Sequence, residues 1–280
     1  MAQVDVAPFS VSLREWRGHR RLSQLQLATA AATTSRHLSF LETGRSRPTR
    51  TMVLRLAAAL DLPLRARNDL LMTAGFAPAF PRSDLGTAEL APFRDAIDRL
   101  LAQHEPFPAF VVDGRWDVVD ANAAARRLLV GGERNLVRLV YGGTWQPLLD
   151  NWSALAPAGV RRLEAELQRH PGDTRLRELL AHARAACDGD EAPDEASDEL
   201  VLCPHFRFGD TVVRTLSVVA RFGSARDVTL DELRVELVFP ADDDADAFFR
   251  SAAMSQSAAG DALISVDGSS GPVPHREDTT

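Results

Sequence analysis

The sequence lacks lysine altogether, has only two cysteines and contains no long apolar run. Cys187 and Cys203 cannot form a disulfide framework in a chain of 280 residues, which is long enough to bury a core without one. No apolar stretch is long enough to predict a membrane span, and the N-terminus lacks the charged start and apolar core of a secretory signal. We therefore expect a cytoplasmic protein without a membrane partner.

Motifs for catalysis or metal binding are also missing. The sequence has no Gly-x-Ser-x-Gly, Walker loop or His-Glu-x-x-His, and no nucleophile with a nearby partner. His182, Cys187, Cys203 and His205 are zinc-ligand types, but the first two lie five residues apart on an expected helix and do not share a face. The acidic segment 188–199 lacks the glycine of a calcium loop. We expect no enzyme activity, no metal and no cofactor.

Charge is distributed unevenly along the chain. Residues 1–82 hold 12 arginines against five acidic residues, whereas residues 83–280 hold 20 arginines against 34 acidic residues. Only residues 1–82 therefore have the positive charge that binding to a polyanion such as nucleic acid needs. The absence of lysine has a simpler explanation, because a GC-rich genome also favours arginine and alanine.

Five helices are expected in residues 11–76. Ser23 and Gln26 have the spacing of a capping box, and Thr34 can cap the helix that follows. Gly44 is positioned to end that third helix, because glycine tolerates the left-handed conformation of this position.

The later part of the chain predicts an α+β domain. A helix is expected over 89–104, and the Asp113-Gly114 turn is flanked by the apolar runs 109–112 and 116–119, which is a strong hairpin signal. Asp120 is expected to cap a helix, and two or three more helices fill about 145–186.

Three further strands complete an antiparallel sheet of at least five strands, with helices inserted in its middle. They are residues 200–208, residues 211–222 and residues 233–239. The last expected helix covers 243–253. The expected domains are a disordered N-terminus at 1–10, a helical domain at 11–76, a linker at 77–88, the second domain at 89–253 and a disordered tail at 254–280.

A run of short motifs in residues 22–48 points to the function of the first domain. In order it contains Leu22-Ser23-Gln24, Leu27-Ala28, Leu38 followed by Leu41-Glu42-x-Gly44, and Pro48. This series resembles the XRE-type helix-turn-helix of phage-repressor-like regulators, and the resemblance covers residues 13–73. The main departure is Ala32, where the family often has glycine. An ordinary helical bundle is the alternative that the resemblance disfavours.

A helix that enters the major groove needs short polar or fork-shaped side chains on its outer side. Residues 34–43 provide them, because burial of the leucines leaves Ser35, Arg36, Ser39 and Phe40 outside as candidate base contacts. Arg36 can pair with guanine O6 and N7 through two hydrogen bonds. Phe40 can contact a thymine methyl or pack against the fourth helix.

Other polar residues around this helix are candidate phosphate contacts. The resemblance implies that Gln24 forms a hydrogen bond with a DNA phosphate. The remaining candidates are Thr34, His37, Thr43, Arg45, Arg47 and Arg50. Arg17 and Glu42 instead look structural, because in this class an arginine on the first helix commonly pairs with the glutamate that ends the recognition helix.

The second domain also carries a family resemblance. Similarity to the MmyB-like ligand-binding domain is carried by residues 105–109, 116–122, 135–138, 150–152 and 227–233. The segment 131–144 is short and glycine-rich for this family. The resemblance implies a PAS-like fold that encloses an apolar cavity for a fatty-acid-like or other hydrophobic ligand. The aromatic candidates for its lining are Phe110, Trp116, Trp145, Phe206, Phe208 and Phe239. Alternatively, these aromatics only fill a core.

The sequence therefore predicts a sequence-specific, DNA-binding transcriptional regulator that acts as a homodimer and senses a hydrophobic ligand. Three other functions remain compatible with it. A nucleophile and base lining the pocket would favour an enzyme, and a large exposed apolar patch would favour an adaptor for another protein. A filled second core would favour a ligand-free DNA-binding protein with a dimerisation module.

Overall fold

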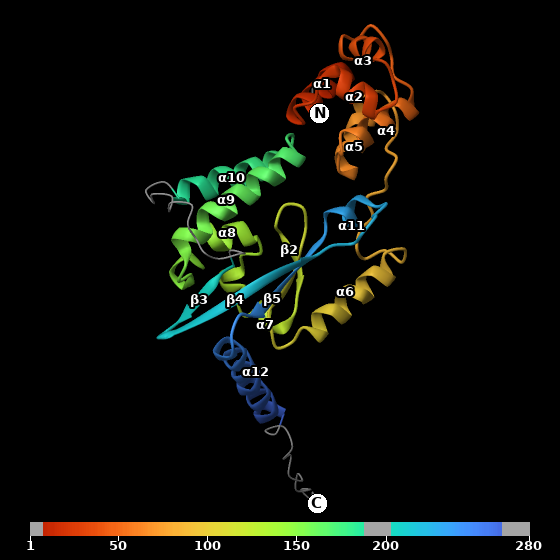
Figure 1. Cartoon of the computed structure of the whole chain (residues 1–280). Helices are drawn as coiled ribbons and strands as arrows, with labels where there is room; N and C mark the ends of the chain where they lie inside the picture. The colour runs from red at the N-terminus through yellow and green to blue at the C-terminus, as the bar shows by residue number, and fades with distance from the viewer. Residues whose placement is uncertain (1–7, 188–202, 265–280) are drawn as a thin grey trace, which may run out of the picture.

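The computed structural model describes residues 8–187 and 203–264 (Figure 1). The acidic segment 188–199 and the first residues of the strand expected at 200–208 lie outside these ranges. None of the described helices is both long and apolar enough to cross a lipid bilayer.

The first domain is the expected five-helix bundle. Its core is formed by leucines that are fully buried, among them Leu13, Leu27, Leu38 and Leu56. The helices are α1 (Phe9–His19), α2 (Gln24–Ala30), α3 (Ser35–Glu42), α4 (Arg50–Ala59) and α5 (Leu64–Thr73).

Local signals fix the ends of these helices as expected. Ser23 accepts a hydrogen bond from the backbone N–H of Gln26, whose side chain accepts one from the N–H of Ser23, so the capping box is complete. Thr34 caps α3 by accepting from the backbone N–H of His37. Gly44 follows α3 with a φ of +72°.

The second domain is built on the five-stranded antiparallel sheet that the sequence predicts. Its strand order is β2-β1-β5-β4-β3, so the hairpin formed by the first two strands lies beside the last strand. The strands are β1 (Ala109–Val112), β2 (Val118–Ala121), β3 (His205–Phe208), β4 (Thr211–Ala220) and β5 (Arg234–Pro240).

Helices cover both faces of the sheet (Figure 1). The helix α6 (Ala91–Gln103) packs on one face through Ile97 and Leu101, and the inserted helices pack on the other. The inserted helices are α7 (Ala123–Arg126), the 3-10 turn η1 (Val130–Gly132), α8 (Leu136–Tyr141), the 3-10 turn η2 (Gln146–Leu148), α9 (Trp152–Arg169) and α10 (Thr174–Cys187).

Two expectations around the first hairpin are wrong. The second strand begins at Val118 and not at residue 116, because Asp113 Oδ1 accepts from the backbone N–H groups of Arg115 and Asp117 and widens the turn. Asn122, not Asp120, caps α7, since its Oδ1 accepts from the N–H of Ala125. Asp120 lies within β2 itself.

Two helices extend beyond the expected ordered region. The helix α1 starts at Phe9, whose side chain is buried in the core of the first domain, although residues 1–10 were expected to be disordered. The last helix, α12 (Asp243–Ile264), passes the expected end at residue 253 and includes eleven residues of the predicted tail. Alanines in this added stretch favour the helix, and Phe249 anchors its first half.

Candidate functional site

The outer side of α3 presents the four residues expected to read bases. Leu38 and Leu41 are fully buried, which turns Ser35, Arg36 and Ser39 outward, with Arg36 exposed. Phe40 is half-buried, and the guanidinium carbon of Arg36 lies 5.5 Å from the centre of its ring. The ring therefore supports the arginine from below by a cation–π contact.

The side chains expected to contact phosphate fall into two groups. Arg45 and Arg47 are exposed after α3, and within the described part of the chain their guanidinium groups have no hydrogen-bond or ion-pair partner. Arg50 instead donates from Nη1 to the carbonyl of Ala77 at 2.5 Å, so it is tied to the linker. His37 is half-buried on α3.

Three further candidates make hydrogen bonds that hold α3. Thr34 is its N-cap, and the hydroxyl of Thr43 donates to the carbonyl of Ser39 at 2.8 Å. Gln24 Nε2 donates to Glu42 Oε2 at 2.8 Å, so its side chain is already engaged within the domain.

Arg17 and Glu42 form an ion pair that orients α3 on α1. Arg17 Nε lies 2.6 Å from Glu42 Oε1, and Nη2 donates to Oε2 at 2.9 Å. Glu42 is only 2% exposed. Burial alone would raise the pKa of Glu42, but the hydrogen bonds from Arg17 and Gln24 lower it below its ordinary value. The carboxylate therefore stays charged and is paired with Arg17 within the domain.

Arg55 stabilises the turn between α2 and α3, a role that the sequence did not predict. Ala32 has a φ of +48°, a left-handed conformation that costs an alanine about 1 kcal/mol. Arg55 Nη2 donates to the carbonyl of Ala31 at 2.5 Å and also to that of Ala32. These bonds come from α4, more than twenty residues away, so no local pattern could reveal them.

An apolar cavity of about 230 Å³ lies in the second domain between the sheet and the helices α8 and α9. Four of the six aromatic residues expected to line it do so, namely Phe110, Trp116, Trp145 and Phe206. Among the described residues that line it, there is no histidine or cysteine. The aliphatic lining that the sequence did not single out includes Leu136, Val137, Val140, Leu155, Leu163 and Val238.

Two of the expected lining residues lie elsewhere. Phe239 follows Val238 on β5 and therefore points to the opposite face, where its ring centre lies 4.7 Å from that of His104. Phe208 lies at the end of β3, two residues beyond Phe206, and stacks on Phe248 of α12 with ring centres 5.0 Å apart. The helix α12 thus packs on Phe208.

Among the described residues that line the cavity, Arg162 on α9 is the one cation. Arg162 Nη2 donates to Glu236 Oε1 at 2.6 Å, and 43% of the arginine side chain is exposed. Its guanidinium carbon lies 4.3 Å from the centre of the Trp116 ring. Trp116 Nε1 is buried and has no hydrogen-bond partner within the described chain. The apolar lining therefore includes a cation and an indole that has an unpaired donor.

Trp116 also connects the cavity to the domain interface. The guanidinium carbon of Arg234 likewise lies 4.3 Å from the centre of the Trp116 ring. Arg162 lines the apolar cavity, whereas Arg234 lines a separate cavity between the two domains. The indole ring therefore contacts one arginine from each cavity.

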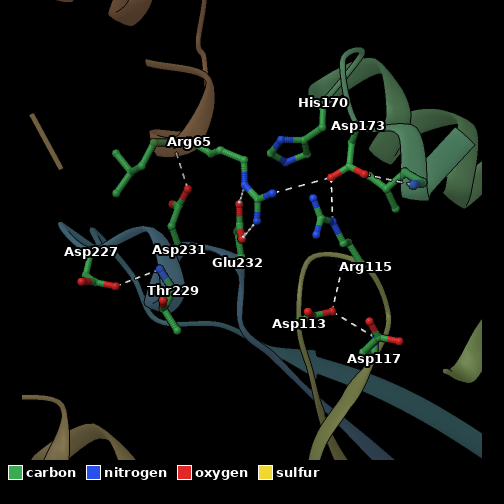
Figure 2. Close-up of polar contacts among 12 residues, drawn as sticks. Arg65, Asp113, Arg115, Asp117, His170, Asp173, Asp227, Thr229, Asp231 and Glu232 are labelled. Carbon is green, nitrogen blue, oxygen red and sulfur yellow. Dashed lines mark hydrogen bonds and ion pairs between the residues drawn. The ribbon is translucent and has the colours of Figure 1, made fainter. Parts of the chain in front are cut away.

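Charged residues join the first domain to the second (Figure 2). Arg65 of α5 donates from Nε to Glu232 Oε1 at 2.5 Å, and Nη1 lies 3.6 Å from Asp173 Oδ2. Arg115 Nε donates to the same carboxylate oxygen at 2.9 Å. Burial alone would raise the pKa of Asp173, but hydrogen bonds from Arg115 and from the backbone of Leu176 lower it. This network ties α5 to the short helix α11 (Val228–Glu232) and to the start of α10.

The helix α11 also contacts the linker and the N-terminus of α5. Asp231 Oδ2 accepts from the backbone N–H of Leu64 at 3.1 Å, which satisfies one of the free donors in the first turn of α5. Asp227 Oδ2 accepts from the N–H of Ser83 at 3.0 Å, and Thr229 donates to the carbonyl of Ser83. One helix of the second domain is thus in contact with both the linker and the first domain.

No three metal-ligating side chains come together among the residues that the structure describes. Neither Cys187 nor Cys203 forms a disulfide within the described residues. The zinc alternative therefore finds no ligand set in residues 8–187 and 203–264.

Comparisons with known proteins agree with this arrangement. Residues 9–70 match the family described as a helix-turn-helix domain. Residues 93–252, more than half of the chain, match the MmyB-like transcription regulator ligand binding domain. No curated protein matches the chain.

One solved structure, an RNA-binding light-oxygen-voltage receptor, aligns over 89% of this chain at 14% identity. The TM-score of 0.22 is too low to indicate a shared fold. The chain spans 63% of the length of that structure.

Proposed function

The chain belongs to the MmyB-like transcription regulators and combines a DNA-binding domain with a ligand-binding domain, and we propose that its ligand is a small hydrophobic, fatty-acid-like acid. The observation that carries this proposal is the apolar cavity with its single cationic residue. An alkyl chain would contact Phe110, Trp145 and the aliphatic side chains. The carboxylate would pair with Arg162, for which Glu236 is the present partner.

The size of the cavity limits the ligand. A volume of about 230 Å³ is below the roughly 300–1,000 Å³ that is usual for drug-sized ligands. A slender alkyl chain suits this space better than a ring system does. Trp116 Nε1 offers an unpaired donor that a carboxylate or hydroxyl oxygen could accept.

On the DNA, we assign base reading to the outer side of α3. Arg36 is exposed, fork-shaped and supported by the Phe40 ring, which is the arrangement that favours a two-bonded contact with guanine. Ser35 and Ser39 lie on the same side. For the DNA backbone, Arg45 and Arg47 are the strongest phosphate candidates, with His37 beside them. The weaker candidates are those whose side chains are already hydrogen-bonded within the protein, namely Gln24, Thr34, Thr43 and Arg50.

Native mass spectrometry of the freshly purified full chain tests the ligand. We expect the folded protein to carry extra mass that is released on denaturation and identified as a long-chain carboxylic acid. Arg162→Met should reduce the retained fraction, because the carboxylate loses its cation while the cavity keeps its apolar lining. A protein that carries no small molecule and binds none when incubated with dodecanoate would contradict the proposal.

We further propose that two chains bind DNA together in the cytoplasm. One recognition helix covers about one half-site, and operators of this class place two half-sites about one turn apart. On the outer face of the sheet, beside α6, Leu216 lies opposite Phe239 and Val218 is two residues further along. They are 48%, 37% and 50% exposed, so an apolar surface is available to a second chain.

The same mass spectra test the dimer. The main species at micromolar concentration should have twice the chain mass, and Leu216→Asp together with Val218→Asp should convert it to single chains. Met72→Asp, which likewise replaces an exposed apolar side chain with an acid but lies on α5, is the matched control and should leave the dimer intact. A wild-type protein that occupies a single half-site as one chain at physiological salt would refute the dimer. It would leave the alternative of an adaptor surface for another protein.

A further inference from the structure

A second cavity, of about 340 Å³, lies between the two domains and is separate from the apolar one. The first domain contributes the loop before α5 together with Arg20 and Arg67. The second domain contributes the end of α9, the residue after β4 and the segment that joins α11 to β5. Domain interfaces are common places for ligand sites. A molecule bound here would contact both the DNA-binding and the sensor domain.

Five arginines and four acidic residues line this cavity. The arginines are Arg20, Arg67, Arg169, Arg221 and Arg234, and His170 lies among them. Most of the acidic residues in the lining already have partners. Glu232 pairs with Arg65, Asp231 accepts from the backbone of Leu64, and Glu166 lies near Arg234 and His170.

Arg234 is the buried cation of this cavity. It is 2% exposed, and its Nε has no hydrogen-bond partner in the described chain. Its closest acidic partner, Glu166, lies 3.4 Å from Nη1, while Nη2 donates to the carbonyl of Asp113 at 3.1 Å. Burial lowers the pKa of Arg234, and the positive charges of Arg221 and Arg162 lower it further. A buried donor without a partner is costly, and an anion in the cavity would satisfy it.

Two more guanidinium groups face the same cavity without a partner. Arg169 ends α9 and Arg221 follows β4, and both are exposed at the rim. Within the described residues neither makes a hydrogen bond or an ion pair. Arg221 instead lies close enough to Arg234 to repel it. Arg169, Arg221 and Arg234 therefore bring three guanidinium groups from distant parts of the second domain to one cavity, and the first two have no acidic partner among the described residues.

We propose that this cavity binds a small phosphate-bearing anion through Arg169, Arg221 and Arg234. A tetrahedral phosphate offers several oxygens in different directions, whereas a single carboxylate offers two in one plane. Guanidinium groups that approach from three sides therefore match a phosphate better. The anion would neutralise the repulsion between Arg221 and Arg234 and bridge the two domains. It would act as a second effector, distinct from the ligand of the apolar cavity.

Titration calorimetry of the full chain with sodium pyrophosphate, at constant ionic strength, tests this site. We expect saturable binding of one pyrophosphate per chain. The double variant Arg169→Ala with Arg221→Ala should weaken it about tenfold or more, because two charge-assisted contacts are lost. Both side chains are exposed, so the variant is expected to fold. Ala158→Trp, which fills the apolar cavity, should leave pyrophosphate binding unchanged, which separates this site from the ligand proposal.

Two controls make the result specific. Arg99→Ala removes an exposed, unpaired arginine from α6 and makes the same charge change as each of the two substitutions in the double variant. Arg47→Ala removes a cation from the surface expected to bind DNA. Both should keep the wild-type affinity. The proposal fails if no saturable binding occurs, if Arg47→Ala abolishes binding, if Arg99→Ala weakens it as much as the double variant, or if citrate binds as tightly as pyrophosphate.

Discussion

Ala158→Trp is expected to abolish the effect of dodecanoate on operator affinity. Ala158 lies on α9 and lines the apolar cavity, so an indole at this position occupies the space that the alkyl chain would need. The coupling to be lost is about 1–3 kcal/mol, or roughly 5- to 150-fold in affinity. The operator is obtained by selection from random duplexes, and fluorescence anisotropy measures its affinity with and without the acid.

The bulk of the tryptophan itself needs a control. Ala165→Trp places the same side chain on the same helix at an exposed position outside the cavity lining, and should keep the full response. Overpacking can destabilise a domain by about 1–3 kcal/mol, so thermal unfolding of both variants is measured alongside. If Ala158→Trp folds, binds the operator and still responds to dodecanoate as the wild type does, the cavity is not the sensing site.

Arg36→Ala is expected to cost about 1–3 kcal/mol of affinity for the operator and to relax specificity at one base pair. The fork-shaped guanidinium supports two hydrogen bonds to guanine, and its loss leaves the other base pairs read as before. The measurement compares the affinities of wild type and variant for the operator and for every single-base change in it.

Arg47→Ala is the matched control for Arg36→Ala, because it removes the same charge from the same surface. It should weaken binding to all duplexes by a similar factor and flatten the salt dependence, since Arg47 is assigned to a phosphate. A uniform loss across all duplexes for Arg36→Ala would remove its base-reading role.

A packed route exists between the ligand cavity and the DNA-binding domain. Trp116 lies against Arg162 in the cavity and against Arg234 in the interdomain space. Glu236, which also lines the cavity, is four residues from Glu232, which pairs with Arg65 of α5. An acid that takes Arg162 from Glu236 would act directly on this segment. The anisotropy measurement tests whether this route couples the two sites.

Local signals made the first domain predictable from sequence. Each helix end is fixed by a residue that lies only a few positions from the groups it caps, so spacing alone locates these ends. The capping residues are Ser23 with Gln26, Thr34 and Gly44. The role of Arg55 is not predictable from sequence, because the carbonyl groups that it contacts are distant in the chain and have no side-chain signature.

The second domain is harder to predict from sequence because its contacts join distant segments. The sheet was predicted, but Phe239 was assigned to the wrong face of a strand on which side chains alternate. Asp120 and Asn122 are both good caps, and only the length of β2 decides between them. The pair formed by Arg65 and Glu232 spans 167 residues, so no sequence period could indicate it.

Operator affinity of the wild-type protein, measured by anisotropy with and without saturating dodecanoate, tests the central claim most directly. For the ligand to act, it must bind the DNA-competent and the DNA-incompetent arrangements with different affinities. A change of roughly 5- to 150-fold is expected, of a size typical for coupled sites. Equal affinity in the two conditions, with the acid shown to be bound, would contradict the account and leave the second domain as a dimerisation module.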